Sequence, residues 1–201
     1  MRSVSPYYAR SSGNTFYFRS KIPCDLRDHF GGRKQFKISL KCSLNSRSEK
    51  IIKSLNRTLC EYQSTHMFLT FFLARINLRT FRVDFASAGH NQMLLCRNNG
   101  TFEELSAKGI PLGIMPDVNF QSCETHIEVG DRLFLYTDGV TEAEDLYMEL
   151  YGKERLLTIL SKYNDKSSID TLNAIKSSLG QYTRGLESSD DITMISLRRE
   201  S

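Results

Sequence analysis

The stretch VGDRLFLYTDGVTEAED, residues 129–145, decides how the rest of the sequence is interpreted. Gly130 and Asp131 mark a turn, and the apolar residues that follow them are typical of a buried strand. The predicted strand stops before Asp138, which is followed by a glycine and then by an acidic loop. A carboxylate at the end of a buried strand is held rigidly, and small neighbours leave its oxygens accessible. Asp138 is therefore the first candidate for chemistry.

A helix and three strands are predicted upstream of this stretch. Residues 46–62 carry apolar side chains at helical spacing along one stripe, which predicts a helix that packs on a core. Three strand-like runs follow, namely MFLTFFLARINL (67–78), FRVDFASAGH (81–90) and QMLLCRNNGTFEEL (92–105). Asn98-Asn99-Gly100 is a hairpin turn signal within the last run. Together the three runs predict an antiparallel meander.

Two helices and a strand are predicted downstream. Residues 152–163 and 167–180 have helical periodicity, and Gly180 stands where a glycine commonly terminates a helix. The stretch DDITMISLR (190–198) predicts a last strand introduced by two carboxylates. Tandem strands, grouped helices and a returning strand define an α+β fold class.

Two aspartates at strand ends suggest a site for a hard cation. Asp138 ends one predicted strand and Asp190 introduces another. Mg²⁺ and Mn²⁺ prefer such oxygen ligands. Asp191 is adjacent to Asp190, and neighbouring residues of an extended chain point to opposite faces, so we favour Asp190 as the ligand. Spacing alone leaves turn carboxylates as the alternative interpretation.

Residues 55–198 resemble the carboxy-terminal portion of the SpoIIE/RsbU-type serine phosphatases, a bacterial branch of the PPM-type metal-dependent protein phosphatases. The resemblance is carried, in order, by LNRTLCE (55–61), MFLTFFLARIN (67–77), SAGHNQMLL (87–95), IPLGIMPD (110–117), VGDRLFLYTDGVTEAED (129–145), YGKERL (151–156) and DDIT (190–193). It implies a PPM-phosphatase-like fold of antiparallel β-sheet layers with flanking helices.

The resemblance also implies an activity, a cofactor and a partner. Asp138 and Asp190 match the family aspartates that help to bind a pair of Mn²⁺ or Mg²⁺ ions, with Gly139 and Asp191 beside them. The implied reaction is hydrolysis of a phosphoserine or phosphothreonine by metal-activated water. The implied substrates are phosphorylated regulatory proteins, notably antagonists of anti-sigma factors. His90 lies in the AGHN loop, where we expect a loop-ordering hydrogen bond rather than a catalytic role.

One family element has no match in this sequence. The family carries a strand with a D-x-S-G-H-G loop upstream of the L-N-R helix, which supplies further metal ligands, and these 201 residues contain no such string. We therefore expect an incomplete metal centre and impaired turnover. We also expect an uncovered sheet edge, which favours self-association. An inactive phosphatase-like module that binds a regulatory protein is the alternative.

The amino-terminal segment differs from the rest in charge and in resemblance. Residues 1–54 carry a net charge of +9 and the remaining residues −5, within a total of +4. GNTFYFR (13–19), IPCDLR (22–27), FGGRK (30–34) and SLK (39–41) resemble the amino-terminal region of phage-type integrases, the tyrosine recombinases. We expect two or three short strands here, with a helix start at Pro23.

These features predict two domains, a basic integrase-like segment at 1–45 and a partial PPM-type phosphatase domain at 46–201. The integrase resemblance makes DNA a candidate partner, through Arg33, Lys34 and Lys37, with a merely solvated basic surface as the alternative. The five cysteines contain no C-x-x-C pair and are interpreted as reduced thiols. No apolar run is long enough to span a bilayer, so we expect no membrane partner and a cytoplasmic location.

Overall fold

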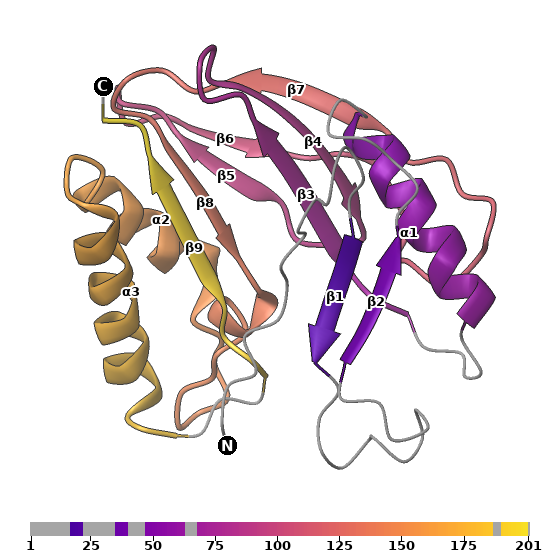
Figure 1. The fold of residues 1–201 in the computed structure, drawn as a ribbon. Coiled ribbons are helices and arrows are strands. Elements are labelled where there is room, and N and C mark those ends of the chain that lie inside the picture. Colours follow the sequence, from indigo (N-terminus) through magenta and orange to yellow (C-terminus); the bar gives the residue numbers. More distant parts are fainter. Residues whose placement is uncertain (1–16, 22–34, 40–46, 63–67, 187–189, 201) are drawn as a thin grey trace. The chain divides into compact units, whose positions relative to one another are not determined.

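The computed structural model describes residues 17–21, 35–39, 47–62, 68–186 and 190–200. Figure 1 shows its helices and strands. In chain order they are β1 (Tyr17–Lys21), β2 (Gln35–Ser39), α1 (Ser48–Tyr62), β3 (Phe71–Ile76), β4 (Arg82–Ala88), β5 (Met93–Cys96), β6 (Phe102–Leu105), β7 (Ser122–His126), β8 (Arg132–Tyr136), the 3₁₀ turn η2 (Asp138–Val140), α2 (Gly152–Lys162), α3 (Ser168–Thr183) and β9 (Met194–Arg198). This mixture of helices and antiparallel sheets confirms the predicted α+β class.

The amino-terminal segment contains two short strands, as predicted. β1 and β2 pair antiparallel, with Arg19 as the register partner of Lys37. The helix start predicted at Pro23 and the domain boundary predicted at 45/46 fall outside the described residues. The boundary therefore stays a prediction.

The chain divides into two compact units. The first comprises Met1–Leu73, Ala86–Gly89 and Lys108–Ser122, and the second Ala74–Phe85, His90–Ala107 and Cys123–Ser201. Besides the β1-β2 pair, the described strands form a three-stranded sheet in the order β3-β4-β7 and a four-stranded sheet in the order β6-β5-β8-β9. No described helix has both the length and the apolar content needed to cross a membrane.

The core of the first unit fixes α1 through its apolar stripe. Ile51, Ile52 and Leu55 are buried together with Ala86 and Ala88 of β4 and with Leu112 and Phe120. Asn56, on the same helix, is fully buried and binds the 113–116 loop through its side chain. Its Nδ2 donates to the Met115 carbonyl (2.7 Å) and its Oδ1 accepts from the Gly113 amide (2.9 Å). The L-N-R asparagine therefore holds the I-P-L-G loop in place.

Asn56→Ala is expected to lower the free energy of unfolding by about 2–3 kcal/mol, because the fully buried Asn56 amide would be lost and the Gly113 amide and the Met115 carbonyl would lose their partner. Arg57→Ala is the matched control on the same helix. Its ion pair with Asp117 is exposed (3.2 Å), so its loss should cost less than about 1 kcal/mol. Urea denaturation of the two variants checks the difference, and equal midpoints would contradict the assigned role of Asn56.

The predicted meander is wrong between β4 and β5. β4 lies between β3 and β7, whereas β5 lies between β6 and β8, so the two strands belong to different sheets. The chain leaves the first sheet at Gly89, whose amide donates to the Gly109 carbonyl (3.0 Å). Gly89 has φ +71°, and a Cβ there would lie 2.6 Å from Cγ of Pro111. Only glycine fits both the left-handed backbone and this close approach.

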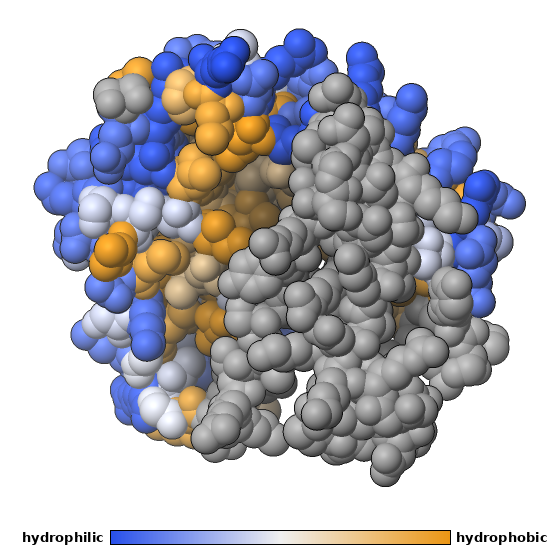
Figure 2. All heavy atoms as spheres, viewed as in Figure 1, coloured by the Kyte–Doolittle hydropathy of each residue, from blue (hydrophilic) through white to orange (hydrophobic). Residues whose placement is uncertain are grey.

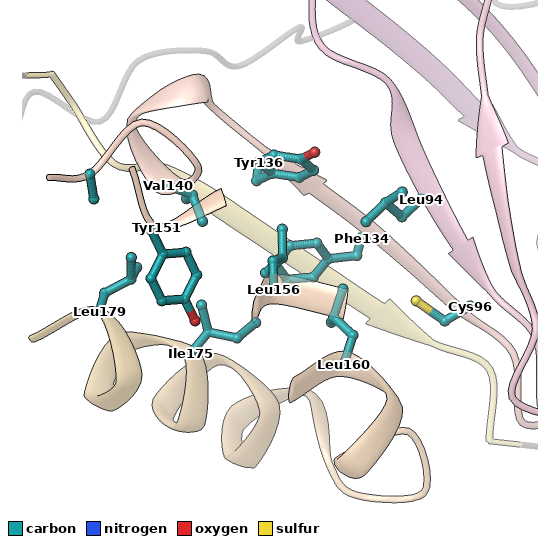
Figure 3. Close-up of a cluster of buried hydrophobic side chains, with 11 residues drawn as sticks. Leu94, Cys96, Phe134, Tyr136, Val140, Tyr151, Leu156, Leu160, Ile175 and Leu179 are labelled. Carbon is teal, nitrogen blue, oxygen red and sulfur yellow. The ribbon is translucent and has the colours of Figure 1, made fainter. Parts of the chain in front are cut away.

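The core of the second unit lies between the four-stranded sheet and helices α2 and α3 (Figure 3). Phe134 of β8, Tyr151, Leu156 of α2 and Ile175 of α3 are fully buried in it. Arg132 is also fully buried, and its guanidinium donates to the Lys166 carbonyl and to the Ser196 hydroxyl, both at 2.6 Å. Burial lowers the pKa of this guanidinium. Arg132 thereby ties β8 to β9 and to the turn between the two helices.

Gly180 does not terminate α3, contrary to the prediction. The helix continues to Thr183 and ends where Arg184 and Gly185 adopt left-handed φ values of +51° and +81°. The last turn is retained because the Tyr182 hydroxyl donates to the Glu149 and Leu150 carbonyls (3.0 and 3.1 Å). Tertiary contacts therefore override the helix-breaking tendency of Gly180.

β9 is an outer strand of the four-stranded sheet as far as the described residues show. Ile195 and Leu197 are exposed on it, at 58% and 39%, and Figure 2 shows apolar surface along the course that β9 takes in Figure 1. Their register partners Leu135 and Leu133 on β8 are less exposed. Such a strand can pair with another chain, so self-association stays a prediction.

Candidate functional site

Asp138 starts η2 and is separated from the end of β8 only by Thr137. Its backbone carbonyl accepts hydrogen bonds from the amides of Thr141 and Glu142, both at 2.8 Å. Val140, two residues further on, is fully buried in the core of the second unit. The side chain of Asp138 is exposed. The backbone therefore fixes the position, and the carboxylate itself faces solvent.

Thr137 joins this turn to the segment that precedes β9. Its amide donates to the Thr193 carbonyl (3.0 Å), and its hydroxyl accepts from the Thr193 amide (2.9 Å). The same hydroxyl donates to the Asp191 carbonyl (2.8 Å). Three hydrogen bonds therefore hold the Asp138 turn against the segment that contains Asp190 and Asp191.

Gly139 permits this close approach. A Cβ at this position would lie 2.8 Å from the carbonyl oxygen of Asp191 and 3.3 Å from that of Asp190. Both neighbours are backbone atoms, which cannot move aside as a flexible side chain could. The glycine of the T-D-G sequence is therefore required for the contact between the two acidic segments, and not for a special backbone conformation.

The carboxylates of this site are ligands of the kind that hard cations prefer, but their number is small for a metal centre. Asp190 and Asp191 are exposed, as is Asp138, and one oxygen of Asp190 accepts from the Asp191 amide (2.7 Å). Among the described residues, no group of three or more His, Cys, Asp or Glu side chains is arranged to hold a metal ion. The described ligand set therefore does not fit a two-ion centre.

His90 and Cys96 are the two other residues near the quoted motifs whose side chains could serve chemistry. Nδ1 of His90 lies 3.0 Å from the Asn91 carbonyl, within its own loop, and the loop-ordering role expected for it stays a prediction. Cys96 is a free, buried thiol, and burial raises its pKa to about 12. A thiol of such pKa is not a nucleophile at neutral pH.

The candidate nucleic-acid residues are only partly described. Lys37 lies in β2, opposite Arg19 of β1 by register, whereas Arg33 and Lys34 lie outside the described residues. The DNA hypothesis therefore stays a prediction from the sequence.

Thr137 and Thr193 are the site residues that sequence reasoning missed. Both lie inside quoted motifs, T-D-G and D-D-I-T, but the hydrogen bonds between them join positions more than 50 residues apart. The available signal was a threonine directly before Asp138 and another three residues after Asp190.

Comparisons with known proteins identify the family of this chain. The family model described as "Stage II sporulation protein E (SpoIIE)" matches residues 38–200, and a "Domain of unknown function (DUF6538)" matches residues 7–62. The chain is 32% identical over 154 residues to "Phosphoserine phosphatase RsbU" of Bacillus subtilis (strain 168), covering 75% of this chain and 45% of RsbU. It therefore spans less than half the length of that relative.

Solved structures show the same fold. The SiaA-PP2C domain of Pseudomonas aeruginosa superposes with a TM-score of 0.67 at 17% identity, covering 95% of this chain and 78% of that domain. The phosphatase domain of SpoIIE from Bacillus subtilis gives a TM-score of 0.57 at 16% identity, covering 100% of this chain and 93% of that domain. The fold is therefore that of the PP2C-type phosphatases.

The match to the SpoIIE model extends over most of the sequence. The chain belongs to the SpoIIE family and corresponds to the carboxy-terminal portion of a SpoIIE/RsbU-type phosphatase domain. The resemblance to the SpoIIE/RsbU-type phosphatases expected from the sequence is confirmed, and the resemblance of the first residues to phage-type integrases stays a prediction.

Proposed function

We propose that this chain is a metal-dependent serine/threonine protein phosphatase of the SpoIIE/RsbU type with impaired turnover, acting on phosphorylated regulatory proteins in signalling. The observation that carries the proposal is the three-bond contact of Thr137, which holds the Asp138 turn against the Asp190 segment. Membership of the SpoIIE family supports the reaction class. The relative named as a phosphoserine phosphatase supports phosphoserine as the substrate group.

The proposed metal ligands are Asp138 and Asp190, and the proposed ions are Mn²⁺ or Mg²⁺. Two carboxylates are fewer ligands than a pair of ions requires, and the sequence has no D-x-S-G-H-G string to add more. We therefore expect weak occupancy and slow turnover, and we assign no catalytic step to a metal ion. Gly139 supports the contact sterically, Asp191 through its carbonyl, and His90 by ordering its loop.

The proposed partner is a phosphorylated antagonist of an anti-sigma factor or a similar regulatory protein. The test is release of inorganic phosphate from such a phosphoprotein by the purified chain, with Mn²⁺ and with EDTA. We expect release above the EDTA level, at a rate well below that of the SpoIIE phosphatase domain assayed in parallel. The proposal would be contradicted by a rate of phosphate release that is the same with Mn²⁺ and with EDTA. It would also be contradicted by a rate equal to that of the SpoIIE phosphatase domain.

An inactive phosphatase-like module is favoured by the small number of carboxylates at the site. It predicts capture of the same phosphoprotein with no phosphate release, unchanged by chelator. A DNA-binding fragment instead predicts duplex affinity that falls steeply with salt and is lost when Arg33, Lys34 and Lys37 are made neutral.

A further inference from the structure

The loop at residues 145–150, which follows the Asp138 turn, presents large apolar side chains to solvent. Leu146, Tyr147 and Met148 are consecutive and are 54%, 77% and 79% exposed. Single exposed apolar residues are ordinary on protein surfaces. Three in a row at a loop tip contribute little to the core, so folding does not account for them.

The tip is held in one conformation by its own hydrogen bonds. Oδ1 of Asp145 accepts from the amides of Tyr147 (2.8 Å) and Glu149 (3.0 Å), and the Met148 amide donates to the Asp145 carbonyl (3.1 Å). Met148 has a left-handed φ of +62°, a conformation that is unfavourable for a bulky side chain and that persists only where its surroundings enforce it. The apolar tip is therefore preorganised.

The base of the loop is fixed to the same turn that carries Asp138. The Tyr151 amide donates to the Ala143 carbonyl (2.8 Å) and the Gly152 amide to the Thr141 carbonyl (2.9 Å). Tyr151 is fully buried beside Val140 in the core drawn in Figure 3. The loop therefore keeps a constant position relative to the candidate site, which lies only a few residues upstream.

Acidic residues flank the apolar tip in the sequence. Glu142, Glu144 and Glu149 are exposed, and Asp145 is half-buried. Within the described part of the chain, no Lys or Arg forms an ion pair with any of the four. A matching surface would therefore have an apolar pocket bordered by basic residues, because opposite charges across an interface favour association and like charges oppose it.

We propose that the 145–150 loop docks the phosphorylated regulatory protein, through an apolar pocket of that protein bordered by Lys or Arg. This inference rests on the proposed function and adds the surface that selects the substrate. Tyr147 and Met148 are the anchors. A tyrosine is a frequent source of binding energy in interfaces, and the flexible methionine side chain adapts to an apolar pocket. The acidic border sets the choice of partner and the rate of encounter.

The test is the affinity of the full chain for one purified, phosphorylated anti-sigma-factor antagonist, measured by calorimetry in EDTA so that no hydrolysis intervenes. The tip variant, which combines Tyr147→Ser with Met148→Ser, should bind about tenfold or more weakly than the wild-type chain. Ile169→Ser is the matched control, because Ile169 is 71% exposed on α3 and away from this loop. Glu144→Gln combined with Glu149→Gln should weaken binding severalfold and reduce its dependence on salt.

Asp145→Asn is the control for the acidic border, because it removes the charge but keeps an acceptor oxygen for the two amides. Asp145→Ala removes the same charge and the acceptor while keeping the apolar tip, so weaker binding by Asp145→Ala than by Asp145→Asn, with an unchanged unfolding midpoint for the chain, measures preorganisation. Equal affinities of the tip variant and the Ile169 variant would overturn the docking role, as would a wild-type chain that does not bind the phosphoprotein. The tip variant could instead bind the phosphoprotein as the wild-type chain does and differ only in the sedimentation of the chain without its partner. The loop would then contact a second copy of the chain, and the proposal would be overturned.

The proposed function is judged separately by Mn²⁺-dependent hydrolysis of para-nitrophenyl phosphate, a substrate too small to reach the loop. The tip variant should retain whatever rate the wild-type chain has with this substrate. Loss of that rate in the tip variant would place the loop in the catalytic site and overturn its assignment to docking.

Discussion

Asp138→Asn is expected to reduce Mn²⁺-stimulated phosphate release to the level seen in EDTA, a loss of about hundredfold if the wild-type rate permits that range. The reason is charge, because the amide keeps the size of the side chain but loses the anionic oxygen that a hard cation requires. The measurement is phosphate release at several Mn²⁺ concentrations.

The structure predicts that this variant stays folded. The hydrogen bonds at position 138 are accepted by the backbone carbonyl from Thr141 and Glu142, so an asparagine side chain leaves them intact. The free energy of unfolding should change by less than about 0.5 kcal/mol, as for an exposed substitution. Asp165→Asn, at another exposed carboxylate of the same unit, is the matched control and should keep the wild-type rate. Undiminished release in Asp138→Asn would remove Asp138 from the site.

Regular elements were predictable because their signals are local. The apolar stripe of α1, the Asn98–Gly100 turn between β5 and β6, and the periodicity of α2 and α3 each depend on residues close in sequence. The Arg97 amide donates to the Thr101 carbonyl (2.8 Å) across that turn, as a hairpin requires. Two predictions were wrong because the features concerned depend on long-range contacts. These features are the change of sheet at Gly89 and the continuation of α3 past Gly180.

The sequence indicates the candidate residues of the site but not the contacts that bring their segments together. The order of motifs points to Asp138 and Asp190, but no periodicity indicates that the Thr137 hydroxyl bonds to the Asp191 carbonyl 54 positions away. The role of Gly139 could not be predicted either, because a side chain is excluded there by backbone atoms of the 190–191 segment, which is distant in sequence. The buried amide of Asn56 is a third case, because its partners lie in a loop distant in sequence.

Asp131 has the largest expected effect on stability. The residue follows the turn glycine Gly130, and its side chain is almost completely buried. One carboxylate oxygen accepts from the Asn98 amide (2.8 Å), and the other accepts from the Glu128 amide (2.9 Å) and from Nη1 of Arg97 (2.8 Å). The carboxylate therefore joins the turn after β5 to the turn before β8.

Asp131→Ala should lower the free energy of unfolding by about 3–5 kcal/mol, because it leaves two backbone amides without their acceptor and removes one of the two carboxylates that pair with Arg97. Glu103→Ala is the matched control, since Glu103 also pairs with Arg97 (2.7 Å) but is half-exposed, so its loss should cost about 1 kcal/mol or less. Asp131→Asn should fall between the two, because the amide keeps one acceptor oxygen and loses the charge. Urea denaturation of the three variants gives the order, and a Glu103 variant as unstable as Asp131→Ala would show that the charge of Arg97, rather than the two amides, determines the cost.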